Sequence, residues 1–156
     1  MGDPDPARVV ADADVLAADL LTGGSAREAL DGVRAHSWVD LVASDPLLED
    51  AESVIAVLAD GALAADWRER VERDRVRVEQ AAGDHPALAS AYEGNAAHVL
   101  SFDEGLTSAG ANLSLQPHVQ VSVRPPAAFA ALFDPAALYA AVEGGEYPGP
   151  DRDPRE

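Results

Sequence analysis

Residues 9–16 read VVADADVL, an apolar run that ends in two acids, and residues 99–103 read VLSFD, a second apolar run that ends in an acid. Short continuous apolar runs are typical of strands that a parallel sheet buries on both faces. Ligands of an open parallel sheet bind outside the C-terminal ends of its strands, so two such strands side by side would bring their acids to one point. Carboxylates gathered without basic partners predict a site for a divalent cation.

Strand and helix patterns alternate along the rest of the chain. This alternation predicts an α/β protein with a three-layer α/β/α fold and a mainly parallel central sheet. We expect strands at 8–11, 38–43, up to 103 and at 119–123, and helices near 15–21, 25–34, 45–58, 63–82, 86–97 and 127–133. The folded domain should span residues 8–142. Residues 1–7 and the acidic tail at 143–156 are rich in Pro, Gly and polar residues, which predicts disorder.

The composition excludes several kinds of chemistry. The 156 residues include 28 acids and 11 basic residues, all of them arginine, for a net charge of -17; there is no lysine and no cysteine. A Walker A phosphate loop and Schiff-base chemistry both need lysine, and disulfides, thiolate zinc sites and cysteine nucleophiles need cysteine. The side chains left for catalysis are carboxylates, hydroxyls and four histidines.

The acidity itself is typical of a cytoplasmic protein from a cell that keeps molar salt inside. At molar salt the Debye length is only about 3 Å, so repulsion between surface acids is screened and the charge serves solvation. No stretch of 18 apolar residues is present, and the N-terminus lacks the basic region of a signal peptide. These features predict a soluble protein that makes no membrane contact.

The order of elements and acids resembles the PIN domain family of metal-dependent ribonucleases, which includes toxins of toxin-antitoxin pairs. DADVL at 12–16 and SFDEGL at 101–106 are similar to the first and last acidic motifs of that family. A further family acid on the helix after the second strand would be Asp50, which we prefer to its neighbour Glu49. Asp84, just before the helix at 86–97, matches another. The resemblance covers roughly residues 8–140 and rests on the ordered set of short motifs.

The resemblance implies a metal-dependent endoribonuclease. Asp12, Asp84 and Asp103 would hold Mg²⁺ or Mn²⁺, and Asp50 would complete the set of catalytic acids. In this kind of hydrolysis a metal ion activates water and stabilises charge on the phosphate oxygens. Carboxylates that converge on one point can hold that metal ion. The partners implied are an RNA substrate, an antitoxin protein and a second copy of the chain in a homodimer.

Each acid also has a structural interpretation. Asp14 could cap the first helix, Asp84 could cap the helix at 86–97, and Glu49 and Asp50 could be solvated helix residues. The arginine-rich stretch at 68–77 could contact RNA phosphates, but its interleaved acids favour a helix with i,i+3 and i,i+4 ion pairs. The alternative function is a catalytically inactive module that binds RNA or a protein partner.

Overall fold

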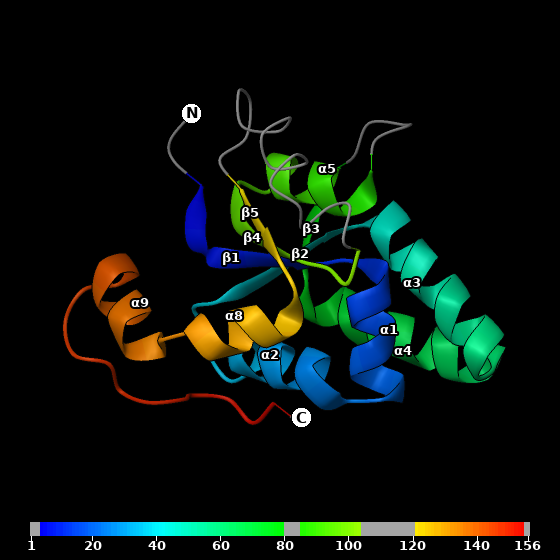
Figure 1. The fold of residues 1–156 in the computed structure, drawn as a ribbon, viewed down its shortest axis with the longest axis horizontal. Helices are drawn as coiled ribbons and strands as arrows, with labels where there is room; N and C mark the ends of the chain where they lie inside the picture. The colour runs from blue at the N-terminus through cyan, green and yellow to red at the C-terminus, as the bar shows by residue number, and fades with distance from the viewer. Residues whose placement is uncertain (1–3, 80–84, 104–120, 155–156) are drawn as a thin grey trace.

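A computed structural model describes residues 4–79, 85–103 and 121–154 of the chain. Its sheet has five strands, all parallel, in the order β3-β2-β1-β4-β5 (Figure 1). The strands are β1 (Asp5–Ala11), β2 (Asp40–Ser44), β3 (Val76–Val78), β4 (Ala96–Leu100) and β5 (Ser122–Arg124). The α/β class and the parallel sheet that we expected are therefore confirmed.

Helices cover both faces of the sheet. They are α1 (Ala13–Leu21), α2 (Gly24–Arg34), α3 (Asp45–Leu58), α4 (Gly61–Asp74), α5 (Pro86–Glu93), α8 (Pro126–Leu132) and α9 (Pro135–Val142). Figure 1 shows α5 on one side of the sheet and α1, α2 and α8 on the other, which makes three layers. In the part of the chain that the structure describes, no helix is long and apolar enough to span a membrane.

The two central strands form the middle of the core. Val10 and Val99 are fully buried, and Val9 and Leu100 are at most 1 % exposed. These side chains come from the two apolar runs that predicted buried strands. Because consecutive side chains of a strand point to opposite faces, burial of adjacent residues requires cover on both faces, which the helix layers provide.

Both flanking segments have partners in the structure. β1 begins at Asp5, inside the segment 1–7 for which composition predicts disorder, and its first amide donates to the Asn95 carbonyl at 2.7 Å. In the tail, the Tyr147 hydroxyl lies 2.6 Å from Nε2 of His36, and Asp151 accepts a hydrogen bond from the Ser37 amide at 2.7 Å. Composition cannot reveal these contacts because the partners are distant in sequence.

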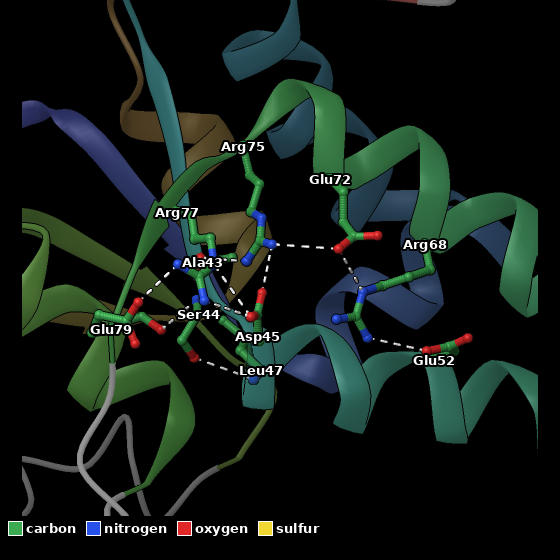
Figure 2. A network of polar contacts seen from close by, with 11 residues as sticks. Ala43, Ser44, Asp45, Leu47, Glu52, Arg68, Glu72, Arg75, Arg77 and Glu79 are labelled. Carbon is green, nitrogen blue, oxygen red and sulfur yellow. Dashed lines mark hydrogen bonds and ion pairs between the residues drawn. The ribbon is translucent and has the colours of Figure 1, made fainter.

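The predicted helix at 63–82 is wrong beyond its midpoint. α4 ends at Asp74, Arg75 is extended, and β3 follows and pairs with β2. An expected helical ion pair does form between Arg68 and Glu72, at 3.6 Å. The side chains of Arg75 and Arg77 instead turn toward Asp45 at the start of α3, as Figure 2 shows. Apolar and polar residues alternate in β3 over only three positions, which is too short a pattern to predict a strand directly after a helical pattern. Formation of this edge strand therefore depends on its pairing with β2.

Gly94, at the turn between α5 and β4, has no room for a side chain. A Cβ there would lie 2.4 Å from Cγ1 of Val42 and 3.1 Å from the carbonyl oxygen of Ser90. We expect Gly94→Ala to lower the free energy of unfolding by about 1–3 kcal/mol, the usual effect of overpacking. Urea unfolding measures it, with Gly61→Ala as the control because a Cβ at Gly61 meets nothing within 4 Å. Equal stability of Gly94→Ala and wild type would contradict this packing.

Candidate functional site

The strand order reverses between β1 and β4. From β1 the chain continues to β2 and β3 on one side of the sheet, whereas β4 and β5 lie on the other side. In open α/β sheets the crevice at the C-terminal ends of such a pair of strands is the usual place for a ligand. Asp12 follows the end of β1 directly, and Ser101 follows the end of β4.

Asp12 is held between a strand and a helix. Its amide donates to the Leu100 carbonyl at 2.8 Å, which continues the pairing of β1 with β4. Its carboxylate accepts from the Ala13 amide at 2.8 Å through Oδ1, so Asp12 is the N-cap of α1. The N-terminal end of a helix favours a negative charge, and the capping bond orients the carboxylate at the crevice.

Ser101 connects the two strand ends through its hydroxyl group. The side chain is fully buried, and Oγ donates to Oδ2 of Asp12 at 3.0 Å. The same oxygen accepts a hydrogen bond from the Asp103 amide, also at 3.0 Å. A serine hydroxyl has one proton to donate and lone pairs to accept with, so both bonds can form at once. Ser101 therefore fixes the distance between the backbone of Asp103 and the carboxylate of Asp12.

Asp14 joins the same group from the first turn of α1. Its Oδ2 accepts from the Phe102 amide at 3.3 Å, while its Oδ1 is buried without a hydrogen-bond partner in the described part of the chain. Burial raises the pKa of Asp14, and the negative charges of Asp12 and Asp103 raise it further. Hydrogen bonds from the Val15 and Phe102 amides lower this pKa, but the net shift is upward. We call Asp12, Asp14 and Asp103 the acidic cluster.

The acidic cluster has the chemistry of a cation site. Among the described residues, Asp12 and Asp14 form no ion pair with arginine or histidine. Carboxylate oxygens are the ligands that Mg²⁺ and Mn²⁺ prefer, and the unpartnered Oδ1 of Asp14 is an acceptor that a cation would satisfy. In the same part of the chain, however, no three acidic or histidine side chains are already arranged as a metal site.

One of the predicted acids, Asp50, is not part of this cluster. Asp50 lies on the exposed surface of α3, as does its neighbour Glu49. The acids whose charges raise the pKa of Asp14 are Asp12 and Asp103, and Asp50 is not among them. Asp84 falls outside the described residues, so its predicted role as a metal ligand stays a prediction. The cap of α5 is His85, whose Nδ1 accepts from the Ala87 amide.

The arginine-rich stretch contributes to structure at this edge of the sheet. Arg75 is 4 % exposed and donates to the Ala43 carbonyl at 3.0 Å and to Oδ1 of Asp45 at 2.6 Å (Figure 2). Arg77 contacts the other oxygen of Asp45 at 2.8 Å. The two guanidinium groups hold the pKa of Asp45 well below its ordinary value. These arginines are engaged by protein acceptors, so the ion-pair interpretation describes them better than a track for RNA.

Sequence reasoning underestimated three residues of the site. It treated Asp14 as a possible helix cap, whereas Asp12 is the cap and Asp14 faces the other acids. It considered Ser101 only as part of a motif. The spacing Ser-x-Asp is nevertheless typical of a serine whose hydroxyl accepts a hydrogen bond from the backbone amide two residues later. Phe102, 46 % exposed beside the acids, was left uninterpreted.

Removal of one negative charge from the cluster should stabilise the metal-free protein. A raised pKa in the folded state means that the stability Asp14 contributes is fully present below its ordinary value of 3.8 and is lost as the pH rises through the raised pKa. We therefore expect Asp14→Asn to raise the free energy of unfolding at pH 7 by roughly 0.5–2 kcal/mol, which is the usual gain when one unfavourable group of a functional site is replaced.

Urea unfolding in EDTA measures this effect, and the gain should shrink toward the lowest pH at which wild type still folds. Asp66→Asn, at an exposed position of α4, is the matched control and should change little. A loss of stability in Asp14→Asn at pH 7 would mean that the hydrogen bond from Phe102 outweighs repulsion in the cluster.

Comparison with known proteins corrects the family assignment. A model of the family described as "family of unknown function (DUF7384)" matches residues 3–155, and no PIN family model matches. No curated protein and no solved structure matches the chain. The PIN resemblance rested on short acidic motifs that many parallel α/β proteins could share, because strand ends at the switch point commonly hold ligands. The chain belongs to the DUF7384 family, a family of unknown function.

Proposed function

We propose that this protein is a metal-dependent endoribonuclease that cuts RNA phosphodiester bonds at the acidic cluster. The observation that carries the proposal is the grouping of Asp12, Asp14 and Asp103 at the switch point of the sheet. Asp14 has a raised pKa there, and its buried Oδ1 has no partner among the described residues. Perturbed carboxyl groups in the ligand crevice of an α/β fold are candidates for catalysis on physical grounds. The placement of these three carboxylates supports the proposal without any family resemblance.

Asp12, Asp14 and Asp103 would hold Mg²⁺ or Mn²⁺. Bound there, the cation would neutralise charge on phosphate oxygens and lower the pKa of water. Ser101 is a positioning residue, because its hydrogen bonds to Asp12 and to the Asp103 amide hold the two strand ends in register. Asp14, whose pKa is raised by burial and by its acidic neighbours, is suited to take up a proton during hydrolysis.

Nucleic acid is the favoured substrate class because of Phe102. Its ring is 46 % exposed although the residue stands between Ser101 and Asp103. An exposed aromatic ring next to a phosphate-cleaving site offers a platform for a base, and stacking of this kind contributes about 1–3 kcal/mol per base in single strands. A single-stranded RNA is therefore the substrate to test.

The experiment incubates the purified protein in concentrated KCl with end-labelled single-stranded RNA, with Mn²⁺ or with EDTA. Cleavage in Mn²⁺ that stops in EDTA supports the proposal, and single-stranded DNA of the same sequence tests the choice of RNA. Phe102→Ala should raise KM more than it lowers kcat, because stacking contributes to binding. RNA that stays intact in Mn²⁺ contradicts the nuclease.

A binding module without catalysis is the second candidate. It is favoured by one observation, that no three metal-ligating side chains among the described residues are already placed around a common point. Such a protein would bind the same RNA equally well with Mn²⁺ and with EDTA and leave it uncut. The partners expected with the ribonuclease, an antitoxin and a second copy of this chain, stay predictions.

A further inference from the structure

A cavity lies between β4, β5, α8 and α9. Its volume is about 320 Å³, and it is lined by His98, Arg124 and a set of apolar side chains, Pro6, Phe129, Leu132, Phe133, Ala137 and Leu138, with Asp134 at the start of α9. None of the acidic cluster lines it. Ligand pockets typically measure about 300–1,000 Å³, so this one is the size of a small molecule with a single ring.

The walls of the cavity are mainly aromatic and aliphatic. The ring of His98 meets the ring of Phe129 edge-on, with centroids 5.6 Å apart, and Phe129 stacks on Phe133 at 5.4 Å. Leu132, another lining residue, is 66 % exposed although it is apolar. Aromatic faces of this kind favour a flat apolar guest, which would pack in offset or edge-on contact with them.

Two polar groups of the lining lack side-chain partners in the described part of the chain. Nδ1 of His98 is buried without a hydrogen-bond partner, and the guanidinium of Arg124 has no ion pair or side-chain hydrogen bond within the described residues. A buried polar group left unsatisfied usually costs about 1–3 kcal/mol, so such a group calls for an explanation. Arg124 is half-buried at the end of β5, whereas five other arginines, at positions 8, 34, 68, 75 and 77, lie beside a carboxylate.

The electrostatics of the pair favour an anion. Burial, and to a lesser degree the positive charge of Arg124, hold the pKa of His98 below its ordinary value, so the imidazole is neutral at pH 7. Arg124 then presents a fixed charge with a fork of N–H donors that matches a carboxylate. A neutral imidazole protonated at Nδ1 can donate one further hydrogen bond to the same group. Among the described residues Asp134 forms no ion pair with Arg124, and its carboxylate accepts from the Ala137 amide.

We propose that this cavity binds a small monocarboxylate with a single apolar ring, whose carboxylate pairs with Arg124 and His98 and whose ring packs against Phe129 and Phe133. The site is separate from the acidic cluster, and the proposal does not depend on ribonuclease activity.

Titration of the full-length protein with benzoate, followed by ligand-observed NMR in concentrated KCl, tests the site. Two further probes separate its parts: benzyl alcohol has the ring without the charge, and acetate has the charge without the ring. We expect benzoate to bind at least about tenfold more tightly than either, since a charge-assisted hydrogen bond and the burial of a ring each contribute that much.

Variants locate the binding. Arg124→Gln should weaken benzoate at least about tenfold, and Ala137→Trp, at an exposed lining position of α9, should block the cavity while it leaves both polar groups in place. Arg73→Gln, at an exposed arginine outside this cavity, should bind benzoate as wild type does. Thermal unfolding checks that each variant is folded.

No benzoate binding at millimolar concentration would overturn the proposal. So would equal affinity for benzoate and benzyl alcohol, or an affinity for benzoate that Arg124→Gln and Ala137→Trp both leave unchanged.

Discussion

Cleavage of RNA in Mn²⁺ is expected to fall at least roughly 100-fold when Asp12 or Asp103 is replaced by asparagine, because loss of an outer-sphere partner of a metal ligand already costs about 10–100-fold. Asparagine keeps the size of the side chain and the oxygen that accepts the Ala13 amide in the N-cap of α1. The fold should therefore survive in Asp12→Asn, and the loss should appear in kcat. The measurement is the initial cleavage rate of end-labelled RNA across Mn²⁺ concentrations.

The control for this experiment is Asp66→Asn, which removes the same charge from an exposed position of α4 and should cut RNA at the wild-type rate. Asp50→Asn tests the predicted helix acid separately, because Asp50 is exposed on α3 and carries no contact to the cluster in the described structure. If Asp12→Asn and Asp103→Asn cut RNA as fast as wild type, the acidic cluster is not the catalytic site.

Loss of the buried arginine at the sheet edge is expected to have the largest effect on stability. Arg75→Met removes the donor to the Ala43 carbonyl and to Asp45 but keeps most of the apolar stem. Breaking a buried ion pair costs about 3–5 kcal/mol, and because the side chain of Asp45 is 36 % exposed, solvent should reduce that to about 2–3 kcal/mol. Urea unfolding at pH 7 in concentrated KCl gives the value.

Arg77→Met is the matched control, since Arg77 contacts the same carboxylate but is 54 % exposed. An exposed ion pair contributes little and is screened by salt, so this variant should lose little stability. The lowered pKa of Asp45 means that its stabilising contribution is present above the ordinary value of 3.8 and is lost as the pH falls below it. The difference between wild type and Arg75→Met should therefore narrow in acid. Equal losses in both variants would show that burial of Arg75 does not matter.

Patterns within a short window were sufficient for much of the fold. The apolar runs at 9–11 and 99–100 predicted buried strands. The helix predicted at 45–58 is α3, and Ser44 Oγ caps it by accepting from the Leu47 amide at 3.2 Å. Capping and strand burial depend on neighbouring residues and on side-chain periodicity, both of which a sequence displays directly.

Contacts between distant segments decided the rest. Ser101 and Asp12 lie 89 residues apart, and their hydrogen bond exists only because β1 and β4 are neighbours in the sheet. Arg75 reaches Asp45 across 30 residues, and β3 pairs with β2 where a helix was predicted. Asp14 differs from an ordinary helix acid only in its burial and in its two acidic neighbours.

The sequence by itself determined that this chain folds as a parallel α/β domain with acids after two central strands, because hydrophobic periodicity and helix caps are local properties. Only the tertiary structure decided which acids share one site and which arginines form ion pairs with carboxylates. It also decided that His98 and Arg124 line the same cavity. These features depend on the burial of side chains and on distances between residues that are remote in sequence. Such burial and distances arise only when the strands pair and the helix layers cover the sheet.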